Sequence, residues 1–284
     1  MDAAVAPDAC LDEQREAAEI VALLEALYVR HCVDFRQYAP GSLRRRLLHA
    51  RCLLNCDSWP ALERRLAATP ALVPTLVNAL TLPVSDVFRD PEFFLALRLT
   101  VLPHLATFPS IRVWVAGCGG GEEVYSLAIL FREEGLFDRT VFYATDINSD
   151  ALRTAAAGVY DLERADAFMA NHRASGSRRS LSESCTAAYG RLAFDRALRQ
   201  RMVFSDHSLA TDAVFAEVQL VTCRNVLIYF DRPLQNRALG LFAEALSPGG
   251  GLGLGSKESL RFLPNQAAFE SWVPAQRLFR RRSF

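Results

Sequence analysis

From about residue 109 onward, short apolar runs alternate with helical patterns, and this alternation limits the fold more than any other feature. The apolar runs, typical of buried strands, cover 111–116, 141–145, 218–223 and 251–255. The helical patterns cover 122–133, 150–157 and 232–246. Strands that alternate with helices form βαβ units, so the sequence predicts an α/β domain with a mostly parallel sheet over 109–284.

The stretch from about 160 to 204 fits this alternation poorly. It contains a polar segment at 174–180 that is rich in serine and arginine. We therefore expect an insertion or a flexible excursion within the domain. A turn is expected at 247–250, because Ser-Pro-Gly-Gly is a strong turn sequence.

The preceding part of the chain has helical patterns and an uneven charge. Residues 1–27 carry seven acids and one arginine, whereas 28–66 carry eight arginines and three acids. Ser42 is the expected N-cap of the second helix. The expected helices cover 12–29, 43–54, 59–68 and 71–80. The predicted organisation is an acidic N-terminal helix or tail over 1–27, a small all-α domain over 28–90 and a linker helix over 91–108.

The overall charge balance excludes some classes of partner. The 284 residues include 32 basic and 32 acidic side chains. A net charge of zero argues against general binding of nucleic acid or acidic membranes, since both need excess cationic charge. No apolar run reaches the roughly 18 residues of a membrane span, the acidic N-terminus is unlike a signal peptide, and the seven cysteines lack metal-ligand spacing. We expect a cytoplasmic protein without a metal site, a nucleic-acid partner or membrane insertion.

A glycine-rich turn links the first predicted strand of the α/β domain to its helix. The segment 117–123 has the sequence Gly-Cys-Gly-Gly-Gly-Glu-Glu. Glycines let a ligand approach the backbone, but the two acids would repel a pyrophosphate. Asp146 ends the next strand, where an acid can bind a ribose diol. The combination favours a nucleoside with a cationic tail, such as S-adenosylmethionine, over a dinucleotide.

Four segments in collinear order resemble the CheR-type chemoreceptor glutamate methyltransferases. They are Phe-Arg-Asp-Pro-Glu-Phe-Phe at 88–94, Gly-Glu-Glu-Val-Tyr-Ser at 121–126, Ala-Thr-Asp-Ile-Asn at 144–148 and Cys-Arg-Asn-Val-Leu-Ile-Tyr-Phe at 223–230. The resemblance covers about 28–280. It implies a Rossmann-like class I methyltransferase domain with a small inserted β-subdomain, preceded by a helical domain. It also implies methyl transfer from S-adenosylmethionine to glutamates of receptor signalling helices, with S-adenosylhomocysteine as product.

The resemblance assigns roles to individual residues. Arg89 and Tyr229 are the expected catalytic residues. The expected cofactor-binding residues are Ser85, Arg89, Ala116, Gly117, Gly119, Gly121, Glu122, Glu123, Asp146, Ser208, Leu209, Cys223, Arg224 and Asn225. No metal ligand is expected.

The chain departs from the family pattern at several positions. Gly119 and Gly120 replace a Ser-Thr pair, and Pro83 and Ser208 each replace an Asn. These changes predict fewer side-chain hydrogen bonds to the cofactor, although the backbone of the glycine turn is retained. Lys257, the only lysine among 32 basic residues, replaces a Ser. We hypothesise that this position requires a compact cation.

A basic face is predicted on the second helix. It comprises Arg44, Arg45, Arg46 and Arg51. Two interpretations carry similar weight. Such a face is commonly only solvated, whereas the family suggests that it docks to the acidic cytoplasmic helical bundle of a chemoreceptor. The protein is expected to be a monomer.

Several interpretations stay open. In isolation, Arg89 would bind local carbonyl groups, Tyr229 would be a core aromatic residue and Cys223 would serve packing. The main hypothesis is a protein-glutamate O-methyltransferase, and the alternative is a noncatalytic signalling module of the same fold that binds S-adenosylmethionine or S-adenosylhomocysteine. A small-molecule methyltransferase is disfavoured by the basic helical domain.

Overall fold

The computed structural model describes residues 7–81 and 85–283, with side chains from residue 12 onward. The chain forms two compact units. The helical unit comprises the chain before residue 83 together with 229–234, and the sheet unit comprises 83–228 and the chain from 235 onward. The structure therefore divides the chain near residue 83, and not at the predicted residue 90.

The helical unit is built from amphipathic helices whose leucines form its core. Its helices are α1 (Pro7–His31), α2 (Pro40–Leu53), α3 (Trp59–Ala68), a 3-10 turn (Pro70–Leu72) and α4 (Val73–Thr81). Buried core residues include Leu27, Leu47, Leu62 and Leu76. Helix α1 packs with α3, and α2 packs with α4. The predicted boundary at residue 27 lies inside α1, so the acidic stretch and the start of the helical unit are one helix.

The start of α2 also differs from its prediction. The helix begins at Pro40, with Ala39 as N-cap and no side-chain cap, so Ser42 lies inside the first turn. Proline suits this position because its missing N–H would be unsatisfied there anyway. In α3, by contrast, the side chain of Ser58 caps the helix by accepting a hydrogen bond from the Ala61 N–H.

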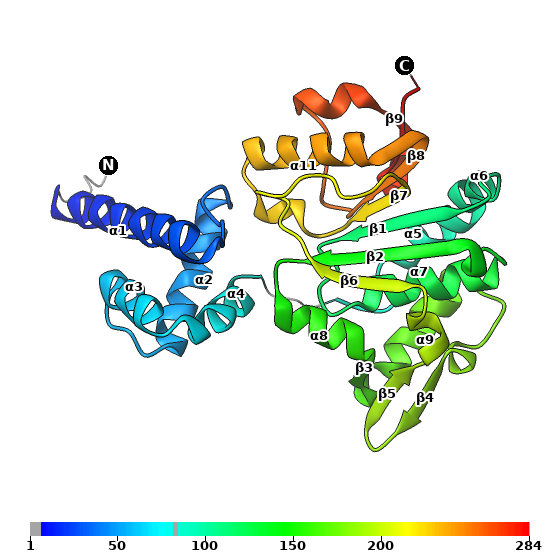
Figure 1. Cartoon of the computed structure of the whole chain (residues 1–284), viewed down its shortest axis with the longest axis horizontal. Helices are drawn as coiled ribbons and strands as arrows, with labels where there is room; N and C mark the ends of the chain where they lie inside the picture. The colour runs from blue at the N-terminus through cyan, green and yellow to red at the C-terminus, as the bar shows by residue number, and fades with distance from the viewer. Residues whose placement is uncertain (1–6, 82–84, 284) are drawn as a thin grey trace, which may run out of the picture. The chain divides into compact units, whose positions relative to one another are not determined.

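The sheet unit contains a seven-stranded, mostly parallel sheet (Figure 1). Its order is β6-β2-β1-β7-β8-β10-β9, and β10 runs antiparallel to β8 and β9. The strands are β1 (Ile111–Ala116), β2 (Thr140–Asp146), β6 (Met202–Asp206), β7 (Val218–Cys223), β8 (Leu246–Leu254), β9 (Phe269–Val273) and β10 (Leu278–Arg281). The predicted turn at 247–250 is wrong, because β8 runs through it with a register shift against β7.

Helices cover the two faces of this sheet, and successive side chains of β1 pack alternately against the helices on one face and on the other. Val113 and Val115 belong to the hydrophobic cluster that includes the helices before and after β1, while Trp114 packs edge-on against Phe242 with ring centroids 5.4 Å apart. The helices are α5 (Pro91–Ala96), a π-helical turn (Leu97–Val101), α6 (Leu102–Leu105), α7 (Glu122–Glu133), α8 (Ser149–Ala157) and α11 (Arg232–Ala245). The predicted linker helix at 91–108 is therefore part of the sheet unit's core.

The predicted insertion is a folded subdomain between α8 and β6. Its elements are β3 (Val159–Asp161), a 3-10 turn (Leu162–Arg164), α9 (Ala165–Ala174), a second 3-10 turn (Leu181–Glu183), β4 (Cys185–Ala188), β5 (Arg191–Phe194) and α10 (Arg196–Arg199). The strands form an antiparallel sheet in the order β3-β5-β4. Residues 202–204, predicted to lie in the insertion, belong to β6 of the main sheet. We call residues 159–199 the inserted subdomain.

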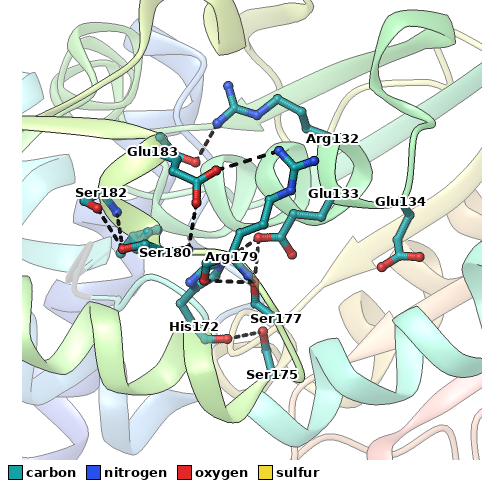
Figure 2. A network of polar contacts seen from close by, with 12 residues as sticks. Arg132, Glu133, Glu134, His172, Ser175, Ser177, Arg179, Ser180, Ser182 and Glu183 are labelled. Carbon is teal, nitrogen blue, oxygen red and sulfur yellow. Dashed lines mark hydrogen bonds and ion pairs between the residues drawn. The ribbon is translucent and has the colours of Figure 1, made fainter.

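A polar network joins the inserted subdomain to the C-terminal end of α7 (Figure 2). Glu133 accepts a hydrogen bond from Ser177 Oγ at 2.7 Å, pairs with His172 Nε2 at 2.7 Å and accepts one from Arg98 Nη2 at 2.6 Å. Burial would raise the pKa of Glu133, but the contacts with His172, Arg98 and Ser177 outweigh it and lower the pKa to about 2. The ionised carboxylate therefore stabilises this junction.

Within 7–81 and 85–283, no helix has both the length and the apolar character needed to cross a bilayer.

We expect Glu133→Gln to lower the free energy of unfolding at pH 7 by an amount on the order of 2–3 kcal/mol. Because the native pKa lies below the unfolded value, this contribution is present above about pH 4.5 and is lost as the pH falls toward 2. Denaturant unfolding at a series of pH values from 7 to 2.5 should show that the difference in free energy of unfolding between wild type and variant becomes smaller. Glu163→Gln, at an exposed position, is the control and should show no such trend. A difference that stays constant would contradict the assignment.

Candidate functional site

The glycine turn after β1 is held by the end of β2. The N–H groups of Gly117 and Cys118 both donate to the Thr145 carbonyl, at 2.8 and 2.9 Å. Asp146 Oδ2 accepts from the Gly119 N–H at 2.8 Å, and its Oδ1 accepts from the Asn148 N–H at 2.9 Å. The predicted ribose-binding acid thus lies directly against the turn. Burial raises the pKa of Asp146, and the backbone donors oppose that effect.

Gly121 shows why this turn requires glycine. Its φ is +92°, in the left-handed region that favours glycine. A Cβ at this position would lie 2.7 Å from Ala155 Cβ and 3.2 Å from the Tyr160 hydroxyl. The backbone of the turn is therefore packed against α8 and the inserted subdomain.

Glu122 and Glu123 open α7, and each is paired with an arginine through one oxygen. Glu122 Oε1 accepts from Arg164 Nη1 at 3.0 Å, and Glu123 Oε2 accepts from Arg224 Nη1 at 3.1 Å. Among the described residues, the second oxygen of each carboxylate is buried and has no hydrogen-bond partner. These oxygens can accept hydrogen bonds from a ligand.

The electrostatics of the turn favour a cation. Burial raises the pKa of the Cys118 thiol, and the nearby charges of Asp146, Glu123 and Glu122 raise it further. Burial also raises the pKa of Glu122, although the hydrogen bond from Arg164 opposes this. A concentration of negative charge would repel a pyrophosphate and attract an ammonium or sulfonium group.

The loop 85–90 lies against the first turns of α7. The Phe88 N–H donates to Ser126 Oγ at 2.7 Å, and Phe88 and Asp90 have φ values of +53° and +57°. Such left-handed residues are uncommon and often occur at functional sites. Arg89 between them is half-buried, and its guanidinium makes no hydrogen bond or ion pair with any described residue. It is free to contact a ligand, and the expectation that Arg89 binds local carbonyl groups receives no support.

Arg224 has an interior role that the sequence did not indicate. Only 2% of its side chain is exposed. Its Nη2 donates to the Arg89 carbonyl at 3.0 Å and to Asp90 Oδ2 at 2.7 Å, and its guanidinium carbon lies 4.1 Å from the centre of the Phe93 ring. Together with the contact to Glu123, these interactions join the end of β7 to α7 and to the loop before α5. Among the described residues, the buried Nε of Arg224 has no hydrogen-bond partner, so its cofactor-binding role stays a prediction. Cys223 beside it is fully buried, as its packing interpretation expects.

Asn225 follows Arg224 in a strained conformation that Glu258 maintains. The φ of Asn225 is +62°. The buried Glu258 carboxylate accepts from four backbone N–H groups at distances of 2.6–3.1 Å, those of Asn225, Val226, Leu227 and Gly255. Burial raises the pKa of Glu258, and these backbone donors oppose the effect. The carboxylate thereby fixes the loop after β7 against the end of β8.

Ser208 and Leu209 lie just beyond β6, whose last residue pairs with Asp146. The Ser208 N–H donates to Asp212 Oδ2 at 2.9 Å, and its hydroxyl accepts from the Ala210 N–H at 3.3 Å. The Leu209 side chain is buried. The structure thus places both residues, Ala116, the turn and Asp146 at the carboxyl edge of the parallel strands, where ligands bind in open α/β sheets. Ser85, at the start of the 85–90 loop, contacts Arg164 through its carbonyl.

The predicted docking arginines lie in the helical unit, and one of them is not on its surface. Arg46 is 5% exposed, donates to the Leu80 carbonyl at 2.5 Å and lies 4.0 Å above the centre of the Tyr229 ring. The prediction that Arg46 belongs to an exposed basic face is therefore wrong. Arg45 is exposed, Arg44 donates to Glu16 Oε2 at 2.7 Å, and Arg51 lies over Trp59.

Tyr229 belongs to the helical unit, where its carbonyl accepts from the Ala39 N–H at 2.8 Å. Arg46 covers one face of its ring. Its catalytic role stays a prediction. Pro83 lies outside the described residues. Among the described residues, no group of three or more His, Cys, Asp and Glu side chains is placed to hold a metal ion.

Comparison with known proteins identifies the family. The model described as the CheR methyltransferase SAM-binding domain matches residues 83–274. The chain belongs to the CheR methyltransferase family. The expected family and its class I methyltransferase fold are therefore confirmed.

Relatives over most of the chain agree with this assignment. The Pseudomonas putida KT2440 protein named "Putative methyltransferase Cher3" is 51% identical over 269 residues, covering 95% of this chain and 98% of its own. "Chemotaxis protein methyltransferase 2" of Pseudomonas aeruginosa PAO1 is 33% identical over 202 residues, which cover 70% of this chain and 71% of that protein. The N-methyltransferase NodS of Bradyrhizobium japonicum, whose crystal structure is in complex with S-adenosyl-l-homocysteine, is 15% identical in sequence and has a TM-score of 0.40. The match covers 70% of this chain and 90% of the NodS chain. That last likeness is too low to inform function.

Three residues of this site were missed in the sequence. Glu258 directly follows Lys257, the position at which the chain departs from the family pattern, so an acid beside that departure was a usable signal. The Lys257 side chain itself is exposed, and the hypothesis about its cation stays a prediction. No sequence signal separated Tyr160 and Arg164 from other tyrosines and arginines.

We expect Arg224→Lys to destabilise the protein by about 2–4 kcal/mol, because lysine cannot make all of these contacts and a buried carboxylate would lose its partner. Urea unfolding measures the loss. Arg196→Lys, at an exposed position of the inserted subdomain, is the matched control and should stay within about 0.5 kcal/mol of wild type. Equal stabilities of the two variants would contradict the interior role of Arg224.

Proposed function

We propose that the chain is a protein-glutamate O-methyltransferase that transfers a methyl group from S-adenosylmethionine to glutamates of cytoplasmic chemoreceptor helices. The observation that carries the proposal is the pair of buried, unpartnered carboxylate oxygens of Glu122 and Glu123 at the glycine turn. Family membership makes S-adenosylmethionine the expected ligand. The receptor substrate is supported by relatives whose names describe chemotaxis protein methyltransferases.

The residues present fit this cofactor. Glu123 Oε1 would accept a hydrogen bond from the cofactor's ammonium group, and Asp146, whose oxygens retain free lone pairs, would accept from the ribose hydroxyls. Ser208 and Leu209 would border the adenine, and the backbone of the glycine turn and Ala116 would contact the amino-acid end. When bound, the cofactor supplies a methyl group on a positively charged sulfonium.

The substrate chemistry explains why this site needs no strong general base. A glutamate side chain has a reference pKa of about 4.3, so its carboxylate is already ionised near neutral pH. The remaining task is to align that carboxylate with the methyl group and to exclude water. The free guanidinium of Arg89 is suited to orient the incoming carboxylate through a bidentate contact.

We expect Arg89→Ala to reduce methyl transfer by about 100-fold, the scale associated with loss of substrate positioning. Because the Arg89 guanidinium has no partner among the described residues, the substitution should change the free energy of unfolding of the protein by less than about 0.5 kcal/mol. A filter assay for base-labile methyl groups on a receptor fragment measures transfer, and Arg178→Ala, at an exposed position, is the control. Full activity of Arg89→Ala would contradict the assigned role.

Calorimetric titration with S-adenosylmethionine and S-adenosylhomocysteine tests the binding that this proposal shares with the noncatalytic alternative, and the filter assay for methyl transfer separates the two. An enzyme binds both ligands and methylates its receptor. Binding of either ligand without transfer to the cognate receptor would instead support a signalling module. Failure of the wild type to bind either ligand would contradict both.

The helical unit is proposed to dock the acidic receptor bundle through Arg44, Arg45 and Arg51. Arg45 is exposed and has no ion pair with any residue that the structure describes. Arg44, by contrast, already pairs with Glu16, and the hydrogen bond between them is the chief cause of the lowered pKa of Glu16. Arg45 is therefore an exposed cation that a partner can bind without displacing Glu16. A partner's carboxylates would have to compete with Glu16 for Arg44.

We expect the triple substitution of Arg44, Arg45 and Arg51 by Ala to weaken receptor binding by about tenfold at low salt, with the difference shrinking at high salt. Methylation kinetics at two ionic strengths measure this effect. Arg64→Ala, at an exposed position of α3, is the control for a change of surface charge elsewhere in the unit. Unchanged kinetics of the triple variant would exclude this docking face.

A further inference from the structure

The inserted subdomain contacts the backbone of the glycine turn directly. The hydroxyl of Tyr160, in β3, donates to the Gly120 carbonyl at 2.7 Å. The side chain is 4% exposed, and its ring packs against Phe168 and Phe194. Burial and the charge of Glu122 raise the pKa of Tyr160, so the hydroxyl keeps its proton and acts as the donor. A rigidly packed side chain of the subdomain thus fixes the middle of the turn.

A second residue of the subdomain contacts both sides of the candidate site. Arg164 donates to Glu122 Oε1 at 3.0 Å and to Asp86 Oδ1 at 2.9 Å, and it also donates to the Ser85 carbonyl. Its guanidinium lies 4.7 Å from the centre of the Phe168 ring. A single side chain therefore fixes one oxygen of Glu122 and the start of the loop that carries Arg89.

These two contacts are not the main attachment of the subdomain. At the opposite end of α7, Glu133 binds His172 and Ser177 of the subdomain (Figure 2), and Arg132 donates to Ser184. Apolar residues of the subdomain, including Phe168 and Leu192, share a hydrophobic cluster with α7. The subdomain would remain attached without Tyr160 and Arg164, so these residues are well placed to set the shape of the turn.

We propose that Tyr160 and Arg164 are positioning residues that hold Gly120 and Glu122 in the cofactor-binding arrangement, and so couple the inserted subdomain to the cofactor site. The inference rests on the proposed binding of S-adenosylmethionine. Coupling of this kind is reciprocal. If a ligand of the subdomain changes the affinity for the cofactor by some factor, the cofactor changes the affinity for that ligand by the same factor. A protein contact made by the subdomain would then alter cofactor affinity.

The test uses the full chain and S-adenosylhomocysteine. Tyr160→Phe removes one hydroxyl and should weaken binding about fivefold, the scale of one buried hydrogen bond. Arg164→Gln removes the charge and should weaken binding about tenfold or more, with Arg164→Lys intermediate because it restores the cation. Matched controls lie in the same subdomain. Tyr189→Phe alters a fully exposed tyrosine, and Arg191→Gln breaks an exposed pair with Asp161.

A second measurement separates positioning from a loss of stability. In the wild type, S-adenosylhomocysteine should slow amide hydrogen exchange in β3 and β5 as well as in the turn. In the Tyr160→Phe, Arg164→Gln double variant, saturating ligand should still protect the turn but not these strands. A purely structural role would lower the melting temperature without removing this transmitted protection.

Three results would overturn the inference. They are unchanged affinity in both site variants, equal weakening in the controls, and ligand protection of β3 and β5 that persists in the double variant. Absence of S-adenosylhomocysteine binding by the wild type would overturn the proposed function itself, and this inference with it. Wild-type binding with unchanged variants would overturn the coupling alone.

Discussion

Two carboxylates at the start of α7, those of the buried Glu122 and the half-buried Glu123, determine how the sheet unit is arranged around the glycine turn. Ionised carboxylates removed from water need cationic partners, and Glu122 and Glu123 obtain them from Arg164 and Arg224. These arginines lie 42 and 101 residues away along the chain. Each also contacts the loop 85–90. Meeting one electrostatic requirement therefore brings together the turn, that loop, the inserted subdomain and the end of β7.

The same pairs leave the site open to a ligand. Each arginine engages one oxygen of its glutamate, and the other oxygen has no hydrogen-bond partner within the described part of the chain. An unpartnered buried acceptor has a free-energy cost, which a bound donor or cation would reduce. Since Asp146 lies against the same turn, three acids favour a positively charged ligand there. Packing and hydrogen bonds of the surrounding protein preorganise this negative site.

The sequence predicted those parts of the fold that depend on local pattern. The strands 111–116 and 218–223 and the helix 122–133 match the structure because apolar spacing and the glycine turn define them. The domain boundary predicted at residue 27 from the change in charge lies inside α1, because a change of charge does not interrupt a helix. The burial of Arg46 was not predictable from the sequence. Consecutive arginines in one helix have the same local pattern, and Arg46 is buried because distant residues such as Leu80 pack beside it. The roles of Arg164 and Arg224 in the protein interior depend on similarly distant contacts, so a motif match named Arg224 without its contacts to Glu123, Arg89 and Asp90.

The departures of this chain from its family gain a physical meaning from the backbone of the turn. Gly119 and Gly120 lack the hydroxyls of the Ser-Thr pair, so their side chains cannot bind a cofactor. Both residues nevertheless make backbone hydrogen bonds, from the Gly119 N–H to Asp146 and from Tyr160 to the Gly120 carbonyl. Glycine is also the residue that loses most conformational entropy on ordering. A turn with consecutive glycines therefore depends more strongly on external contacts to keep its shape, and here those contacts come from β2 and the inserted subdomain. Loss of the two hydroxyls should thus increase the dependence of the cofactor site on Asp146 and Tyr160.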